Sequence, residues 1–187
     1  MATRVLKYAI LGLLSRRPMT GYDLWKEFDY ELAEFWHAKH SQIYTELKKL
    51  HDEGDVTFDI EISGDVLEKK QYQLTEKGKE EFLNWLDTEE PIARTAKDVF
   101  RVRMYFCNNL PLSERIHLLE HQKAQHVKRL TTLKTTFKQY EGQDVPDYQS
   151  DRFGDFILLE SAIIREEGII KWMNRCINYC QAASKQE

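Results

Sequence analysis

Residues 41–75 decide the fold, and they read SQIYTELKKLHDEGDVTFDIEISGDVLEKKQYQLT. Early in this stretch Ile43, Leu47 and Leu50 recur at helical spacing, which predicts a helix from about Ser41 to Glu53 with one buried stripe. The opposite face of this helix carries hydroxyl, phenol and ammonium groups, from Ser41, Tyr44, Thr45 and Lys48. Such groups can bond phosphate oxygens and base edges, so the face suits the major groove of DNA. An ordinary solvated helix face carries similar residues, so a prediction of DNA binding needs a second feature in addition to this face.

The rest of the stretch has the pattern of a β-hairpin. Apolar and polar residues alternate from Val56 to Ile62, and a second extended segment follows over 66–74. A three-residue turn at Ser63-Gly64-Asp65 predicts the pairs Ile62–Val66, Ile60–Glu68 and Phe58–Lys70. This register also places Tyr72 and Leu74 on the face that carries Val56 and Phe58. The outer strand of this two-stranded wing then carries Lys69 and Lys70, which can reach the DNA backbone beside the helix.

Helices are predicted on both sides of the stretch. Residues Val5 to Leu14 are almost entirely apolar and predict a buried helix that Pro18 stops. Thr20 and Asp23 form a capping box that opens a second helix, and Thr75 is placed to cap another helix after the hairpin. Three helices followed by a hairpin with a basic strand is the order of a winged helix-turn-helix domain. Because an isolated hairpin is only marginally stable, the wing must pack on the helices.

Composition and charge restrict how such a domain could act. The 187 residues are 42% hydrophobic and 31% charged, with no apolar run long enough to predict a membrane span. The net charge is −4, and residues 1–90 hold 12 Lys and Arg against 19 Asp and Glu, which leaves them at −7. DNA binding must therefore rest on local placement of cations rather than on global attraction. The odd number of cysteines, three, favours a reducing compartment, so a cytoplasmic location is expected.

The second half of the chain predicts long helices. Pro91 marks the boundary, and a helix with a broad apolar surface is expected from Ala96 to Cys107. A helix from Ser113 and a final helix after the loop 144–149 each carry an apolar residue about every 3.5 positions, which is typical of helices that pack side by side. Polar residues interrupt the two series, and they could set the register of packing or line a pocket. They are Lys123, His126 and Glu166.

Since one chain offers few other elements to cover these two series, a second subunit is expected to cover them. The positions predicted for dimerisation are Ile116, Leu119, Leu130, Leu133, Phe137, Phe156, Ile163, Ile170 and Ile177. The predicted fold class is mainly α with a small β-hairpin: a winged helix-turn-helix domain over 1–90 and a long-helix dimerisation domain over 91–187. A two-fold dimer would set two groove-binding helices about one DNA turn apart and require a pseudo-palindromic operator.

One catalytic pattern is present, His117-x-x-Glu120-His121, in which two histidines one helical turn apart could bind zinc and the glutamate could act as base. No second motif supplies a third ligand, and these residues suit the solvated face of an amphipathic helix. Glycine-rich phosphate loops and nucleophile elbows are absent from the sequence. The chain is therefore predicted not to be an enzyme and to need no metal or cofactor, and a zinc-dependent peptidase is the weakest alternative.

Several stretches together resemble the PadR family of transcriptional regulators. They are Leu6 to Leu14 (LKYAILGLL), Thr20 to Leu24 (TGYDL), Phe35 to Tyr44 (FWHAKHSQIY) and Leu67 to Thr75 (LEKKQYQLT), with a looser match through the second half. The resemblance implies a dimer that represses a promoter and releases it when a small molecule binds. In the branch that this chain resembles, that molecule is a phenolic acid such as coumaric or ferulic acid.

The resemblance also implies which side chains contact DNA. The positions that match the family's DNA-contacting elements are Tyr22, Ser41, Gln42, Tyr44, Lys48, Lys69 and Lys70. His40, within the matched stretch Phe35 to Tyr44, and Thr45, on the groove-facing side of the predicted helix, complete the candidate set. At Thr45 many family members carry proline or arginine, so the operator sequence of a relative does not transfer to this chain.

A phenolic acid needs an aromatic or aliphatic slot and a cation for its carboxylate. Candidate effector-binding residues are Phe100, Arg103, Tyr105, His126, Phe153, Phe156 and Trp172, although each of these aromatic residues would also suit a plain helix core. Two other interpretations stay open: a PadR-like regulator of a drug-efflux gene or another gene that responds to a different hydrophobic ligand, and a protein-interaction module that uses the winged helix for protein contacts.

Overall fold

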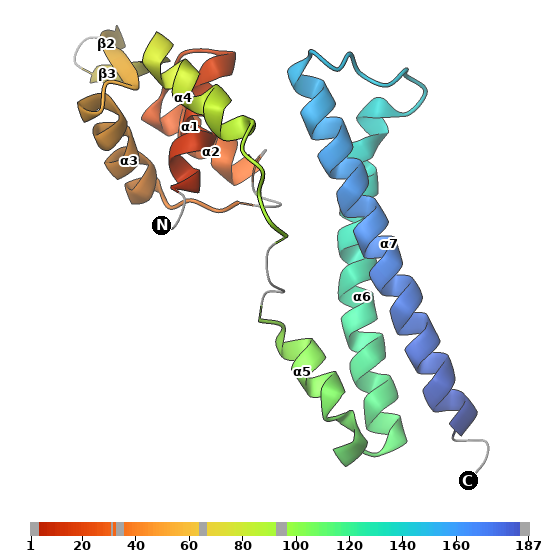
Figure 1. The fold of residues 1–187 in the computed structure, drawn as a ribbon. Helices are drawn as coiled ribbons and strands as arrows, with labels where there is room; N and C mark the ends of the chain where they lie inside the picture. The colour runs from red at the N-terminus through yellow and green to blue at the C-terminus, as the bar shows by residue number, and fades with distance from the viewer. Residues whose placement is uncertain (1–3, 31, 33–35, 64–66, 93–96, 184–187) are drawn as a thin grey trace. The chain divides into compact units, whose positions relative to one another are not determined.

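The computed structural model describes residues 4–30, 32, 36–63, 67–92 and 97–183. The chain divides into two compact units, residues 1–93 and 94–187 (Figure 1). In their described parts, the first unit contains four helices and a small antiparallel sheet, and the second contains helices alone. The predicted class, mainly α with a small hairpin in the first half and long helices in the second, is confirmed.

The elements of the first unit follow the winged-helix order. They are α1 (Val5–Arg16), β1 (Met19–Thr20), α2 (Gly21–Tyr30), α3 (His40–Asp52), β2 (Val56–Ser63), β3 (Leu67–Leu74) and α4 (Glu76–Leu86). Helix α1 continues two residues beyond the predicted end before Pro18 stops it. The capping box of α2 is present: the Asp23 amide donates to the Thr20 hydroxyl at 3.1 Å, and that hydroxyl donates to the Asp23 carboxylate at 2.6 Å. The Thr75 hydroxyl caps α4 by accepting the Gly78 amide at 3.1 Å.

The sheet differs from the prediction in two respects. It has three strands in the order β1-β3-β2, because Met19 pairs with Tyr72 on the outer side of β3. The predicted register is wrong by two residues, since Ile60 pairs with Lys70 and Phe58 with Tyr72. A shift of two keeps every side chain on its predicted face, so the alternation of residues could not distinguish the two registers. The predicted turn lies outside the described residues at Gly64 and Asp65.

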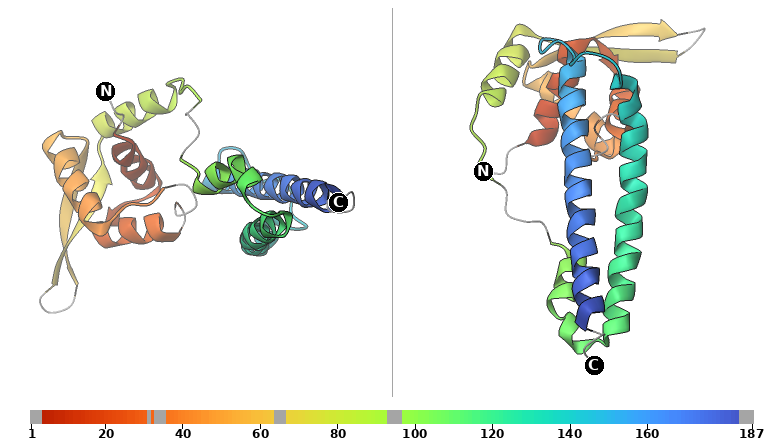
Figure 2. Two further views of the ribbon diagram at one scale, coloured as in Figure 1. Left: turned by 90° about the horizontal axis from the view of Figure 1, so that it is seen from below. Right: turned by 90° about the vertical axis from the view of Figure 1, so that its right-hand side faces the viewer.

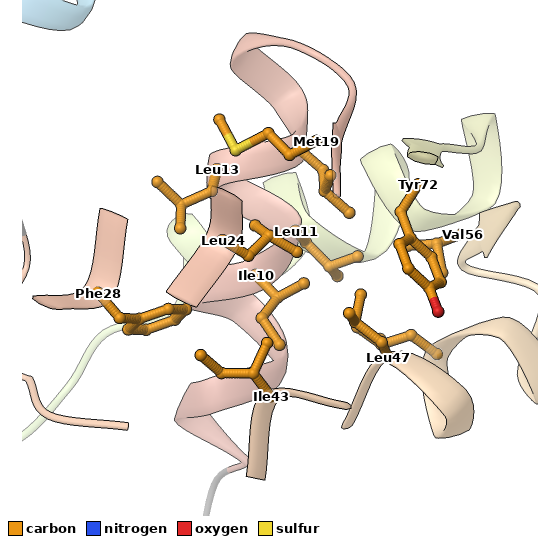
Figure 3. Close-up of a cluster of buried hydrophobic side chains, with 12 residues drawn as sticks. Ile10, Leu11, Leu13, Met19, Leu24, Phe28, Ile43, Leu47, Val56 and Tyr72 are labelled. Atoms are coloured by element: carbon orange, nitrogen blue, oxygen red, sulfur yellow. The ribbon is translucent and has the colours of Figure 1, made fainter. Parts of the chain in front are cut away.

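The core of the first unit lies where α1, α2, α3 and the sheet meet (Figure 3). Helix α1 runs through its centre, which is why nearly all of its side chains are apolar. The labelled side chains that converge there are Ile10, Leu11, Leu13, Met19, Leu24, Phe28, Ile43, Leu47, Val56 and Tyr72. In both views of Figure 2 the paired strands β2 and β3 extend beyond the helices of the first unit, as a wing does.

The second unit is a long antiparallel helix hairpin with a short helix before it. Helix α5 (Val99–Tyr105) and a 3₁₀ turn (Cys107–Asn109) precede α6 (Leu112–Phe137), and a second 3₁₀ turn (Lys138–Tyr140) leads through a loop to α7 (Asp151–Ala183). Helix α5 is shorter than predicted; Ala96, where that prediction begins, lies outside the described residues. Helices α6 and α7 lie side by side along their lengths (Figures 1 and 2). None of the described helices is long and apolar enough to cross a membrane.

The two heptad series face each other inside this hairpin. Leu119 and Leu133 of α6 and Met173 and Ile177 of α7 are buried, and the other positions of both series are half-buried or buried. From the sequence, the apolar positions of both series are predicted to form a subunit interface, because one chain offers few other elements to cover them. In the structure α6 and α7 pack on each other within one chain, and the nine predicted dimerisation residues, Ile116 to Ile177, are buried or half-buried. Their role in a dimer stays a prediction.

A charged cluster interrupts this seam. Glu166 of α7 is 1% exposed, and its carboxylate lies 2.5 Å from Nδ1 of His126 and 3.5 Å from Nε of Arg129. A buried carboxylate is tolerated in a helix seam only when it is bonded in this way. His126 and Glu166 therefore set the pairing of α6 with α7, which is the first of the two roles considered for the polar interruptions.

Candidate nucleic-acid interface

Helix α3 is anchored by one face and exposed on the other. Ile43, Leu47 and Leu50 are fully buried, which fixes the rotation of the helix about its axis. The remaining face presents all six candidate side chains of α3 to solvent, from His40, Ser41, Gln42, Tyr44, Thr45 and Lys48. The predicted stripe and the predicted polar face are therefore both present.

Two of these side chains are partly engaged by the helix itself. The Gln42 carbonyl oxygen accepts the backbone amide of Lys39 at 2.9 Å, and the Thr45 hydroxyl donates to the Ser41 carbonyl at 2.8 Å. The Gln42 amide group and the Thr45 lone pairs remain available to a ligand. Ser41 and Lys48 make no side-chain hydrogen bond or ion pair with the described part of the chain.

Aromatic rings extend this face from α3 onto α2. The ring of His40 lies 4.5 Å from that of Tyr44 and 6.0 Å from that of Trp25, which in turn lies 5.7 Å from Tyr22. Tyr22 and Tyr44 are exposed, and the Lys26 ammonium group lies 4.7 Å from the Tyr22 ring. This aromatic patch, Tyr22, Trp25, His40 and Tyr44, offers phenols for hydrogen bonds and ring faces for thymine methyl groups or sugars.

The wing supplies two exposed cations. Lys69 and Lys70 lie on β3, opposite Glu61 and Ile60 of β2. The Lys70 ammonium group lies 4.1 Å from the centre of the Phe58 ring, a cation–π contact that restrains the side chain. The predicted pairing of Phe58 with Lys70 was wrong, but the diagonal relation of these two residues still brings them together.

An ion network holds α3 against α1, and the sequence did not reveal it. Arg4 binds Glu46 of α3 at 2.5 Å and Glu53 at 2.6 Å. Lys7, only 8% exposed, binds the buried carboxylate of Asp55 at 2.8 Å and lies 3.5 Å from Glu53. The signals were a lysine inside an apolar helix and a glutamate, Glu46, within the buried arc of α3. Each of them interrupts the apolar pattern of its helix, and its ion-pair partner, Asp55 for Lys7 and Arg4 for Glu46, lies far away in the sequence.

The same network shifts the ionisation of its members toward their charged forms. Burial is the largest effect on Lys7 and opposes its charge, but the bonds to Asp55 and Glu81 and the attraction of these carboxylates together outweigh burial and raise the pKa of Lys7. Burial likewise acts against the Glu53 carboxylate, yet its bonds to Arg4 lower the pKa of Glu53. The hydrogen bond to Glu53 raises the pKa of Arg4. These groups therefore stay charged at neutral pH and keep α3 in one position.

The seven candidate effector residues do not form one cluster. Phe100 and Arg103 line an open depression of about 550 Å³ at α5, together with Lys97, Asp98, Val99, Arg101 and Gln122. Trp172 contacts Phe100, with ring centres 6.4 Å apart. The remaining candidates lie elsewhere: His126 binds Glu166, Phe156 packs against Phe137 and Tyr140, and Tyr105 is exposed. Phe153 is half-buried near the start of α7. The structure therefore groups Phe100, Arg103 and Trp172 alone.

The string at His117, Glu120 and His121 lies on the solvated side of α6. All three residues are exposed, and His121 Nδ1 lies 3.2 Å from the Gln125 amide. Across the described ranges, no group of three or more His, Cys, Asp or Glu side chains is arranged to hold a metal ion.

Comparisons with known proteins establish the family. Residues 10–84 match the transcriptional regulator PadR-like family, and residues 96–181 match the virulence activator alpha C-terminal region. The negative transcriptional regulator PadR of Bacillus subtilis is 43% identical over 171 residues, which cover 91% of this chain and 94% of that protein. The chain belongs to the PadR-like family.

Solved structures agree with this assignment. The PadR-like chain is similar to Bacillus subtilis PadR in complex with operator DNA, with a TM-score of 0.89, 41% identity and coverage of 95% of this chain and 99% of that one. It is also similar to Bacillus subtilis PadR in complex with p-coumaric acid, with a TM-score of 0.85, 38% identity and the same coverage. The resemblance and the predicted winged-helix fold are thus confirmed, and the family is one of transcriptional regulators rather than enzymes.

Proposed function

We propose that this PadR-like chain is a homodimeric repressor that binds a pseudo-palindromic DNA operator and releases it when a small aromatic acid binds its C-terminal unit. The observation that carries the proposal is the exposed polar face of α3, whose opposite side is fully buried, in a chain with a TM-score of 0.89 to a DNA-bound relative. A rigidly mounted helix with one free polar face is the device by which helix-turn-helix proteins read the major groove.

In this proposal the two parts of the interface have different tasks. Ser41, Tyr44 and Thr45 of α3 contact base edges, and the exposed lysines of the wing contact phosphates. The first 90 residues carry a net charge of −7, so long-range attraction does not bring DNA to this unit. Local cations must therefore provide a large share of the affinity, and the wing lysines are the sharpest test of the proposal.

The test is DNA binding by a wing variant. A duplex is first selected from a randomised pool by the wild-type chain, and its affinity is then measured by fluorescence anisotropy between 50 and 200 mM salt, a range over which phosphate contacts are sensitive. Lys69→Ala with Lys70→Ala should weaken binding to all sequences alike and reduce the salt slope by about 0.9 for each phosphate that is no longer neutralised. The matched variant Lys79→Ala with Lys128→Ala removes the same charge from exposed sites on α4 and α6, and it should bind like wild type.

The outcomes separate this proposal from a protein-interaction module. If the wild-type chain enriches no duplex, the winged helix does not act on DNA. If both double variants weaken binding equally, the effect comes from net charge and the wing is not the contact.

The dimer has a candidate surface on α7, on the side opposite the seam. Ile157, Ile164, Trp172 and Tyr179 are exposed and recur every seven or eight residues, so they form one outer stripe along the helix. Gly168 lies in the middle of this outer stripe, and a Cβ there would have no atom within 4 Å. Apolar side chains flanking a glycine suit close packing of a second copy of the helix, so we place the two-fold contact on this stripe.

The effector has a candidate site in the depression at α5. Lys97, Arg101 and Arg103 outnumber the single carboxylate there, Asp98, which is paired with Arg101 at 3.2 Å. Arg103 has no ion-pair partner among the described residues, and the Phe100 ring lines the same space. An unpaired guanidinium beside a ring fits a planar aromatic carboxylate, which matches the p-coumaric acid bound by the relative.

The effector proposal is tested by calorimetry and by release of DNA. p-Coumaric acid should bind the wild-type chain and dissociate the selected duplex, whereas Arg103→Ala should bind DNA normally and lose at least about tenfold in effector affinity, as expected for one charge-assisted contact. Lys128→Ala removes an exposed cation of α6 outside the depression and should respond as wild type does.

Two results would contradict this assignment. No heat of binding with p-coumaric acid would exclude this inducer class and favour regulation of a drug-efflux or other gene by a different hydrophobic ligand. Binding that Arg103→Ala leaves unchanged would place the effector outside the depression.

A further inference from the structure

Gly21 is the first residue of α2, is buried, and lies against Tyr44 of the aromatic patch. Its backbone does not require glycine, because Gly54 and Gly142 are the only described residues with φ in the positive range. Glycine at a helix position is less favourable than alanine, because its backbone loses more conformational freedom on folding. A glycine with ordinary backbone angles at a helix start therefore calls for a reason outside its own conformation.

The reason is the ring of Tyr44. A Cβ built on Gly21 would lie 2.7 Å from Cζ of Tyr44, 2.9 Å from its Cε1 and 2.9 Å from its phenol oxygen. The same ring contacts His40, one helical turn earlier on α3, with ring centres 4.5 Å apart. The Tyr44 ring thus contacts both the start of α2 and the His40 imidazole, although it is one of the exposed side chains of α3.

We propose that Gly21 is a positioning residue for DNA recognition: its missing side chain lets the Tyr44 ring rest on the start of α2, where its hydroxyl is held ready for the operator. This inference rests on the proposed function. An exposed tyrosine that is free to turn would have to be ordered on binding, and a ring already held avoids that loss of entropy. An alanine at position 21 would force the ring outward by about 1 Å before ordinary van der Waals contact is restored.

The substitution Gly21→Ala distinguishes an effect on the position of the Tyr44 ring from an effect on the stability of the fold. The atoms that an alanine would meet belong to the far end of a flexible, exposed side chain, so Gly21→Ala displaces the ring without disturbing the core. The thermal midpoint should stay the same or rise slightly, because alanine favours the helix. A reduced DNA affinity at unchanged stability is then the mark of a positioning role.

The experiment is a double-mutant cycle on the duplex selected by the wild-type chain. Gly21→Ala should weaken binding roughly tenfold, the size of one misplaced base or phosphate contact, while leaving the salt slope unchanged. Tyr44→Ala should weaken binding by at least as much. In the Tyr44→Ala background, Gly21→Ala should have no further effect, because the ring it displaces is gone. Gly154→Ala, another glycine near a helix start but with no atom within 4 Å of its Cβ, should bind like wild type.

Each other result overturns the inference. Equal reductions in affinity from Gly21→Ala in both backgrounds would mean that Gly21 acts without Tyr44, and a lower thermal midpoint would mean that it serves packing. Wild-type affinity in Gly21→Ala would refute positioning while leaving DNA binding intact. Failure of the wild-type chain to select any duplex would instead refute the proposed function, and this inference with it.

Discussion

At Gly78, in the first turn of α4, a single hydrogen atom in place of a side chain allows the chain to pack. A Cβ there would lie 2.0 Å from the carbonyl oxygen of Asp55 and 2.9 Å from its carbon. That carbonyl cannot retreat easily, because the backbone amide and the hydroxyl of Thr75 both donate to it, at 3.1 and 3.0 Å. The start of β2 and the start of α4 are therefore joined at one point that admits no side chain.

Gly78→Ala should lower the free energy of unfolding by about 3 kcal/mol, since a methyl group must displace a hydrogen-bonded backbone. Urea denaturation followed by circular dichroism measures the change. The matched substitution is Gly154→Ala in α7, where a Cβ has no atom within 4 Å, and it should be neutral or stabilising by up to about 1 kcal/mol. Similar destabilisation of both variants would contradict the steric explanation.

Among the helices, α2 is short, and hydrogen bonds at its N-terminal cap stabilise it. It has ten residues and follows directly on β1, and the Asp23 carboxylate accepts both the backbone amide of Thr20 at 3.1 Å and the Thr20 hydroxyl at 2.6 Å. The Thr20 hydroxyl is the main reason that the pKa of Asp23 is lowered, and burial acts in the opposite direction. The charged form of Asp23 therefore stabilises the helix start that carries the aromatic patch.

The sign of the resulting pH dependence follows from that shift. A carboxylate with a lowered pKa contributes stability above its ordinary pKa of about 3.9 and loses it as the pH falls through the lower folded value. The free energy of unfolding of wild type should exceed that of Asp23→Asn by about 1 kcal/mol at pH 7, and the difference should shrink as the pH falls below about 3.9. Urea unfolding at several pH values measures it. The exposed Asp29→Asn on the same helix should show no such difference, and a gap that persists at low pH would contradict the assignment.

For the whole molecule, the hairpin of α6 and α7 changes the argument for a dimer. Since α6 and α7 cover each other within one chain, we place the subunit contact of the proposed dimer on the outer stripe of α7. The dimer should place two copies of α3 on one operator, so loss of the dimer should reduce affinity steeply, with each half-site bound alone.

Ile164→Glu, at the centre of the outer stripe, should convert the protein to a monomer at micromolar concentration without changing its helical content, because the seam is untouched. Light scattering after size exclusion measures the mass, and circular dichroism measures the helix. Thr135→Glu, on the solvated face of α6, should remain dimeric. A monomeric wild type, or a dimeric Ile164→Glu, would place the subunit contact elsewhere.

Much of the fold was determined by local sequence alone. The stripe of α3, the capping box at Thr20, the N-cap at Thr75 and the alternation in β2 act over a few residues, so their effect could be predicted without knowing what they pack against. The heptad series of α6 and α7 predicted helices that pack side by side, for the same reason. The exposed face of α3 also followed from periodicity, because burying one stripe leaves the opposite face in solvent.

Partners distant in the sequence were decided by the tertiary structure alone. A two-residue shift of β3 against β2 leaves every side chain on its face, so only packing of Tyr72 and Met19 in the core selects the register. The spacing of a heptad stripe does not reveal whether the stripe packs against a helix of the same chain or of a second subunit. Lys7 pairs with Asp55, Glu46 with Arg4, and Gly21 lies against Tyr44, each 23 or more residues apart in the sequence. Only the folded chain shows that Lys7 and Glu46 form these ion pairs and that Gly21 makes room for a tyrosine ring.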